Sequence, residues 1–269
     1  MDLARERRPL EPPRGVLRRP EPDGLLVGRR VAPSAVLAPL VHHFWAVEWD
    51  LRTPFIAEIL PHPVASITVA LAQRMEVAGV RTERMQASRK GAGRAFGITF
   101  RPAAFQETLG APMSSLTDRA VPIATVFGRD GDVLARALLG APTFEESLAI
   151  AEAFLAPRLR PLGRHATATR DIAERMMRDP SLLLASDVAT ALDVDVRSLQ
   201  RRFRRYIGVG PKWVIRRYRL HEAAERLKAK SPPPLADLAA SLGYADQAHF
   251  ARDFKSVVGH TPGAFAASR

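Results

Sequence analysis

The chain has 269 residues, of which 46% are hydrophobic, and it carries a formal net charge of +12. This length suits two domains, and the apolar content supports packed cores, which excludes global disorder. No apolar run reaches the roughly 18 residues that a membrane span needs. Because the chain has no cysteine, disulfides, thiolate zinc sites and cysteine nucleophiles are excluded.

Residues 1–30 are expected to form a flexible tail rich in proline and arginine. The first part, "MDLARERRPLEPPRGVLRRPEPDG", lacks the apolar core of a signal peptide. We therefore expect a cytoplasmic location and no contact with a membrane.

Residues 31–157 are expected to form a β-rich sensing or dimerisation domain. Three runs are rich in β-branched or aromatic residues and are separated by Gly and Pro: His42–Leu51, Ala65–Leu71 and Gly93–Phe100. Several short strands punctuated in this way are typical of a barrel or a sandwich, so a barrel-like or cupin-like domain is expected. Pro102–Gly110 predicts a short helix, with Pro at its start and Gly at its end.

The pattern becomes helical after about residue 129. The stretches "DVLARALLG" and "TFEESLAIAEAFLAPRL" have apolar residues at helical spacing, and Thr143 followed by Glu146 predicts a capping box. These two helices are expected to pair between subunits. Residues 158–168 predict a linker, which makes the chain an α+β protein of two domains.

Residues 169–269 are expected to be all helical and to contain a repeat. "VRSLQRRFRRYIG" from Val196 and "QAHFARDFKSVVG" from Gln247 align at an offset of 51 residues, and "DVATAL" matches "DLAASL" at an offset of 50. The aligned pairs are Leu199 with Phe250, Phe203 with Phe254, Tyr206 with Val257, Ile207 with Val258, Gly208 with Gly259 and Pro211 with Pro262. This agreement predicts two helix-turn-helix units joined by a long helix from Pro211 to Lys230.

The second helix of each unit is predicted to have an apolar back and a polar front. Asp195 and Asp246 are suited to cap these helices. Arg reads guanine and Gln reads adenine in a major groove, so the candidates for base contacts are Arg197, Gln200, Arg201, Gln247, His249 and Arg252. The candidates for phosphate contacts are Arg204, Arg205 and Lys255.

For a single helix, a solvated basic face is the simpler interpretation. Two copies with matching faces favour binding to a polyanion instead. Residues 161–269 hold 19 Lys and Arg against 11 Asp and Glu, which is a denser positive charge than in the rest of the chain.

Residues 169–269 resemble the DNA-binding domain of the AraC family of bacterial transcription regulators. The resemblance rests on "VRSLQRRF…GVGPKWVIRRYRLHEAAERL" and on "LADLAASLGYADQAHFARDFKSVVGHTP", with its "GY", "HF…F" and closing "G-x-T-P". It implies that the outward positions named above contact bases. Ala248 lies where a longer polar residue would contact a base, so the second unit is expected to discriminate less. The N-terminal half resembles the β-rich effector halves of such regulators only in outline.

The resemblance implies a sequence-specific transcription regulator rather than an enzyme, with two recognition helices in successive major grooves of double-stranded DNA. It implies a homodimer, a small-molecule effector and contact with RNA polymerase, and it implies no cofactor. It identifies no effector-binding residues.

A cupin-type metal enzyme with a DNA-binding tail is one alternative. It needs clustered ligands, and the candidate set is His42, His43 and His62 with Glu48 or Glu58. His42 and His43 are adjacent, so in a strand they point to opposite faces. We therefore expect no metal site.

A nonspecific architectural DNA-binding protein is the other alternative. It would need basic faces without polar residues that distinguish bases, and Gln200 and Gln247 argue against this. A DNA-repair methyl acceptor is excluded, because it needs a nucleophilic cysteine.

Overall fold

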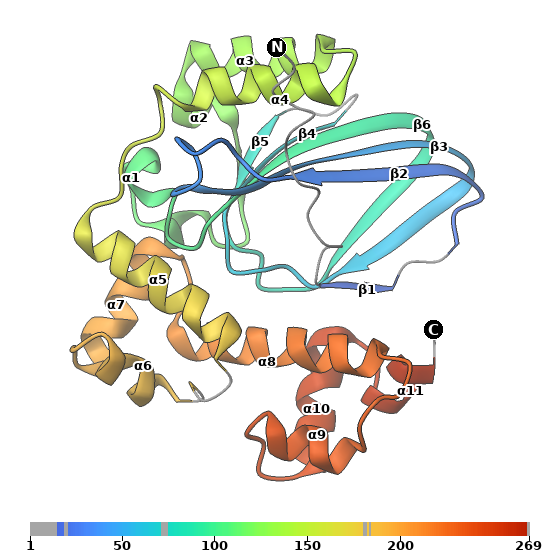
Figure 1. Ribbon diagram of the computed structural model, residues 1–269, viewed down its shortest axis with the longest axis vertical. Coiled ribbons are helices and arrows are strands. Elements are labelled where there is room, and N and C mark those ends of the chain that lie inside the picture. Colours follow the sequence, from blue (N-terminus) through green and yellow to red (C-terminus); the bar gives the residue numbers. More distant parts are fainter. Residues whose placement is uncertain (1–14, 19–20, 71–74, 180–181, 183, 268–269) are drawn as a thin grey trace.

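The computed structural model describes residues 15–18, 21–70, 75–179, 182 and 184–267. Figure 1 shows a curved sheet covered by helices α3 and α4 at the top, with helices α5 to α11 below it. The expected division into a β-rich N-terminal part with trailing helices and an all-helical C-terminal part is confirmed.

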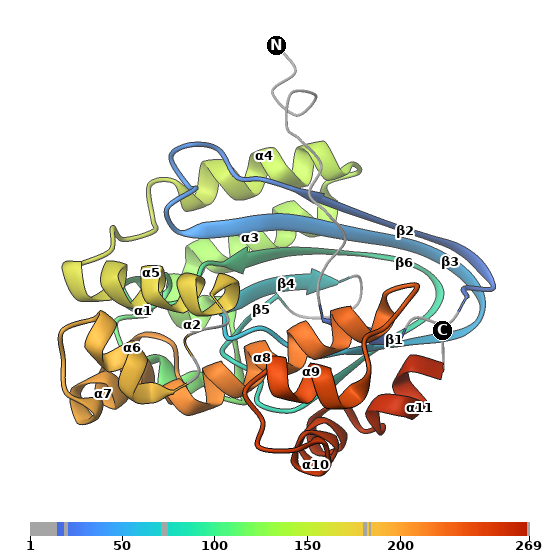
Figure 2. The same ribbon diagram turned by 60° about the horizontal axis from the view of Figure 1, so that its bottom comes forward.

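Seven strands form one antiparallel sheet within the described residues. They are β1 (Val16–Arg18), β2 (Gly24–Val31), β3 (Val41–Ile59), β4 (Ser66–Ala70), β5 (Glu76–Ala78), β6 (Met85–Phe100) and β7 (Ala120–Pro122). Their order is β1-β3-β6-β4-β5-β7, and β2 also pairs with β3. The sheet is strongly curved (Figure 2), but it keeps β7 at one edge and β1 and β2 at the other. The strands therefore form an open curved sheet, not the closed barrel that was considered from the sequence.

The two longest strands, β3 and β6, pair with each other along most of their length. The pairing is interrupted between Leu51 and Phe55, and Pro54 lies in this interruption. Proline has no N–H to donate to a neighbouring strand, so it is tolerated at such an irregularity. The predicted strands His42–Leu51 and Gly93–Phe100 are therefore segments of longer strands.

The expectation of a tail over residues 1–30 is wrong for its described part. β1 pairs with the end of β3, and β2 pairs with β3 from Gly24 opposite Leu51 to Val31 opposite Phe44. The partners lie far along the chain, so local sequence gave no sign of them. The remainder of the expected tail, residues 1–14 and 19–20, lies outside the described residues.

Helices cover one face of the sheet. The N-terminal helices are α1 (Gln106–Leu109), the 3-10 helix η1 (Met113–Leu116), α2 (Ile123–Phe127), α3 (Arg129–Gly140) and α4 (Phe144–Leu155). α3 and α4 confirm the two helices expected after residue 129. Thr143 caps α4, because its hydroxyl accepts a hydrogen bond of 3.2 Å from the Glu146 backbone N–H. α1 begins at Gln106 and not at Pro102, since residues 102 and 103 form a turn and residues 104 and 105 are not helical.

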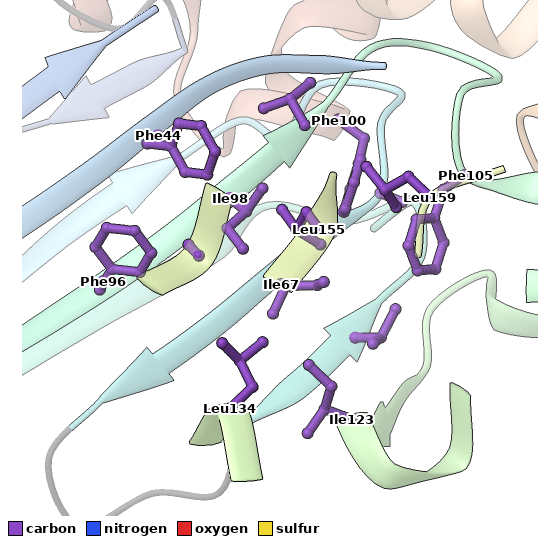
Figure 3. Close-up of a cluster of buried hydrophobic side chains, with 14 of the residues drawn as sticks. Phe44, Ile67, Phe96, Ile98, Phe100, Phe105, Ile123, Leu134, Leu155 and Leu159 are labelled. Carbon is purple, nitrogen blue, oxygen red and sulfur yellow. The ribbon is translucent and has the colours of Figure 1, made fainter. Parts of the chain in front are cut away.

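Figure 3 shows the hydrophobic core between the sheet and these helices. Phe44, Ile67 and Ile98 project from three strands. Leu134 of α3 and Leu155 of α4 pack against them, and all five side chains are buried.

The C-terminal part consists of helices. They are α5 (Arg164–Arg178), α6 (Ala185–Ala191), α7 (Val196–Tyr206), α8 (Pro211–Lys228), α9 (Leu235–Ser241), α10 (Gln247–Val258) and α11 (Pro262–Ala267). The two predicted helix-turn-helix units are α6–α7 and α9–α10, and α8 joins them. α5 starts at Arg164, so the predicted linker 158–168 is too long and the boundary at residue 169 falls inside a helix. Within the described residues, no helix has the length and apolarity of a membrane span.

Each helix-turn-helix unit shares a hydrophobic cluster with the N-terminal part. The cluster of the first unit contains Phe203 and Ile207 together with Val80 from the loop after β5. The cluster of the second unit contains Phe254 together with Leu60, the residue that follows β3. The two parts of the chain therefore pack into one body and are not connected only by a linker.

Candidate nucleic-acid interface

The first candidate recognition helix, α7, begins at a capping aspartate. The Asp195 carboxylate accepts hydrogen bonds from the Ser198 backbone N–H at 2.8 Å and from the Ser198 hydroxyl at 2.7 Å. Both bonds lower the pKa of Asp195, and the bond from the Ser198 hydroxyl has the larger effect. The carboxylate therefore stays negative at the N-terminal end of the helix, where the helix dipole is positive. Leu199 and Phe203 are completely buried on the other side.

The second candidate recognition helix, α10, is built in the same way. The Asp246 carboxylate accepts a hydrogen bond of 2.6 Å from the His249 backbone N–H. Phe250, Phe254 and Val258 are completely buried. Both predicted caps and both predicted apolar faces are therefore present.

All nine candidate DNA-contacting side chains lie at exposed positions. Those on α7 are Arg197, Gln200, Arg201, Arg204 and Arg205, and those on α10 are Gln247, His249, Arg252 and Lys255. Figure 2 shows α7 and α10 along the lower side of the molecule, away from α3 and α4. Two basic faces are thus open to a ligand, while the role of each residue stays a prediction.

Some of these candidate side chains are restrained by contacts within the protein. The Arg201 guanidinium donates a hydrogen bond of 3.1 Å to the Ser198 hydroxyl, which lies next to the cap of α7. The Arg205 guanidinium lies 5.8 Å from the centre of the Tyr206 ring. The His249 ring packs edge-on against Tyr244, with 5.2 Å between ring centres. The imidazole of His249 is therefore held near its own unit.

A polar network holds α10 against α8, and the sequence analysis missed it. The Asp253 carboxylate accepts hydrogen bonds of 2.6 Å from Arg216 of α8 and of 2.6 Å from the Tyr244 hydroxyl. Arg216 also donates to the Ser256 hydroxyl at 2.8 Å. Burial first, and then Asp253, raise the pKa of Tyr244. An acidic residue on an otherwise basic recognition helix was the available signal.

The histidines considered as metal ligands do not gather with the carboxylates into one site within the described residues. His42 is exposed and His43 is buried, but their rings are in contact, with 2.8 Å between the two Nδ1 atoms. The expectation that they point to opposite faces is therefore wrong, because the pairing of β3 with β6 is irregular between Val41 and His43. Burial, and next the neighbouring Arg30, lower the pKa of His43 to about 2. His62 stacks on His221 of α8, with 4.0 Å between ring centres. Within the described part of the chain, no three potential ligands gather into a metal site.

A cavity of about 400 Å³ lies beside the loop between β5 and β6. Its walls are Arg81, Glu83, Arg84, Met85 and Asp118. A second cavity, between the sheet and the helices α3 and α4, measures about 20 Å³. Only the first approaches the volume of pockets that hold small molecules.

Comparison with known proteins places a domain over each half. Residues 188–268 match a family described as a helix-turn-helix domain, and residues 29–122 match a domain of unknown function (DUF6597). A curated AraC-like transcription regulator of Streptomyces antibioticus is 34% identical over 87 residues, which cover 32% of this chain and 28% of the relative. The chain therefore spans less than a third of that relative.

Comparison with solved structures found two further proteins. The C-terminal domain of AraT, a response regulator from Geobacillus stearothermophilus, has 25% sequence identity and a TM-score of 0.36, covering 40% of this chain and 89% of its own. ToxT from Vibrio cholerae has 11% identity and a TM-score of 0.42, covering 91% of this chain and 98% of its own. The chain therefore contains a helix-turn-helix domain over residues 188–268, and over 87 residues it is similar to an AraC-like transcription regulator.

Proposed function

We propose that the protein is a transcription regulator that binds a specific DNA sequence by placing α7 and α10 in successive major grooves. One observation carries this proposal: the chain contains two capped helices, each with a buried apolar back and an exposed front of Arg, Gln or His. A solvated basic face explains one such helix, but it does not explain why the design is repeated.

The connecting helix supports the same arrangement. α8 has 18 residues, which span about 27 Å at about 1.5 Å per residue. Successive major grooves on one face of DNA are separated by about 34 Å. Two recognition helices attached near the ends of α8 are thus separated by a distance of the right order.

The chemistry of the two faces divides into base contacts and phosphate contacts. Residues in the first turns of a recognition helix face base edges, so we assign base contacts to Arg197, Gln200, Arg201, Gln247, His249 and Arg252. Residues later in each helix lie nearer the DNA backbone, so we assign phosphate contacts to Arg204, Arg205 and Lys255. This proposal contains no catalytic step and no cofactor.

Sequencing the DNA that the protein enriches from a random pool tests the proposal. We expect two short conserved boxes about 10 base pairs apart, centre to centre. The box bound by α7 should be the sharper one, because Ala248 and the restrained His249 leave α10 fewer polar contacts. A matched selection with the Arg201→Ala, Arg252→Ala double variant should lose part of each box. Enrichment without any conserved box would favour the nonspecific architectural alternative.

We also propose a homodimer that pairs through α3 and α4, a small-molecule effector and contact with RNA polymerase, as the family resemblance implies. Val133 of α3 is 55% exposed, which fits a surface that a second copy covers. The cavity of about 400 Å³ is the candidate effector site. Sedimentation as a monomer at micromolar concentration would contradict the homodimer. Unchanged melting temperatures across a panel of small acids and bases would count against the effector.

A further inference from the structure

The C-terminal ends of both recognition helices contact the N-terminal part. α7 is followed by Gly208, and α10 is followed by Gly259, which is the equivalent position in the repeat. Both glycines have positive φ, of 110° and 88°. This conformation favours glycine and ends a helix sharply.

At the first unit, Thr117 makes the contact. Its hydroxyl donates a hydrogen bond of 2.7 Å to the carbonyl of Gly208. The approach is close, because a Cβ atom at Gly208 would lie 3.0 Å from the Thr117 hydroxyl and 3.1 Å from the Met113 carbonyl. The segment around η1 therefore lies directly on the end of α7.

At the second unit, Arg84 makes the contact. Its guanidinium donates a hydrogen bond of 3.1 Å to the carbonyl of Val258, the last residue of α10. A Cβ atom at Gly259 would lie 2.4 Å from the same guanidinium. Glu58 of β3 holds Arg84 through an ion pair of 3.2 Å and lies 3.6 Å from the His260 ring.

The chemistry of the Arg84 contact suits the end of a helix. The last carbonyls of a helix have no partner within it, and together they carry a partial negative charge. The guanidinium of Arg84 supplies a missing donor to the last carbonyl of α10, and the hydroxyl of Thr117 donates to Gly208, two residues after the end of α7. The guanidinium also places a positive charge at the negative end of α10.

The two contacting residues belong to segments that are bonded to each other. The Asp118 carboxylate accepts hydrogen bonds of 2.6 Å each from the backbone N–H and the hydroxyl of Thr82. The Asp118 backbone N–H donates to the Val80 carbonyl at 2.9 Å. From α8, Arg217 donates to the Thr82 carbonyl. A continuous series of bonds therefore runs from the end of α7 through this edge of the sheet to the end of α10.

We propose that Thr117 and Arg84 are positioning residues for DNA recognition. Through them the N-terminal part fixes the separation and relative orientation of α7 and α10, and so sets which distance between two DNA boxes the protein accepts. This inference rests on the proposed function. It goes beyond that function because it assigns a determinant of DNA specificity to residues that touch no DNA.

The test measures tolerance to box spacing. The full-length protein is bound to its selected DNA and to versions with one base pair inserted or deleted between the boxes, a change of about 3.4 Å and roughly 35°. The wild type should lose about tenfold in affinity for the altered spacings, a cost of the order of one mismatched base pair. The Thr117→Val, Arg84→Ala double variant should lose less than about threefold.

Matched variants distinguish the positioning role of Thr117 and Arg84 from the effect of losing any contact between the two parts of the chain. Thr117→Ser and Arg84→Lys keep a donor and should keep the wild-type dependence on spacing. Arg170→Ala removes a guanidinium-to-carbonyl bond of 3.1 Å to Pro39, which also joins the two parts but lies on α5. It should leave the dependence unchanged. A double variant with the full wild-type penalty for altered spacing would overturn the proposal.

A second measurement distinguishes failure of this inference from failure of the proposed function. Hydrogen exchange of the double variant without DNA should be faster at the last turns of α7 and α10 and unchanged in α6 and α9. Unchanged exchange at those last turns would overturn the positioning role even if the protein binds no specific DNA. If the wild type shows no preference for any DNA sequence, the proposed function is refuted. The hydrogen-exchange result then still tests whether Thr117 and Arg84 position the two helices.

Discussion

Replacement of Arg201 and of Arg205 by alanine should have different effects, although both side chains are exposed on α7. Arg201 lies in the second turn after the Asp195 cap, where a recognition helix faces base edges, and Arg205 lies in the last turn, nearer the phosphates. A bidentate bond from arginine to guanine contributes about 1–3 kcal/mol of discrimination.

The structure narrows the magnitude for Arg201. Its guanidinium already donates to the Ser198 hydroxyl at 3.1 Å, and breaking that bond offsets up to about 1 kcal/mol. We therefore expect Arg201→Ala to cost about 1–2 kcal/mol at the selected site, roughly 5- to 30-fold. The preference at one base pair should disappear with it.

Arg205→Ala should instead change how strongly the DNA affinity depends on salt concentration. The loss of one phosphate contact lowers the slope of log affinity against log salt by about 0.9. Between 50 and 200 mM salt, the affinity of the variant should therefore fall about 3.5-fold less than that of the wild type. All DNA sequences should be affected alike.

The assay is binding of both variants to single-base variants of the selected site at 50 and 200 mM salt. Arg136→Ala serves as the control, because it removes an equal charge from an exposed position on α3. If Arg201→Ala weakens every site by the same factor, the base contact is refuted. A solvated basic face that only attracts DNA would then be the better account of α7.

Three further predictions concern stability. Phe203→Ala should lower the free energy of unfolding by about 3–5 kcal/mol in a urea titration, because the ring is completely buried; a loss below 1 kcal/mol would contradict this core. His43 has a pKa of about 2 in the folded protein and of about 6.5 in the unfolded chain, so below pH 7 the unfolded chain binds a proton that the folded protein does not. The contribution of His43 to the free energy of unfolding is therefore fully present above pH 7 and decreases as the pH falls. By pH 5 this loss should reach about 2 kcal/mol, and a wild-type pH slope in His43→Gln would refute the assignment. The fragment 164–269 should unfold cooperatively but at lower temperature than the full chain, because it loses Leu60 and Val80 from its cores; absence of a cooperative transition in circular dichroism would contradict an independent domain.

Local patterns were sufficient to predict the ends and faces of the recognition helices. A capping aspartate is recognised by its position three residues before the N–H that it accepts, as at Asp195 and Asp246. The buried faces follow from a spacing of three or four residues. The same holds for the Thr143 cap of α4. These features depend on neighbours in the sequence, so the sequence could specify them.

Features that depend on distant partners could not be predicted. β2 is a strand because its backbone pairs with β3, and nothing within its own eight residues required that pairing. Arg84 and Thr117 have no local sign of their role, since their acceptors lie 174 and 91 positions away. The packing of one part on the other therefore had to come from the structure.

The hydrophobic cluster of the second unit has a consequence for how the chain folds during synthesis. Leu17 of β1 and Phe265 of α11 belong to this cluster, although they are 248 positions apart. β1 is synthesised long before α11. The hydrophobic cluster around Leu17 can therefore be completed only after most of the chain has been made. Contacts between such distant segments slow folding. We therefore expect the first helix-turn-helix unit to fold before the second, and the second unit to complete the fold.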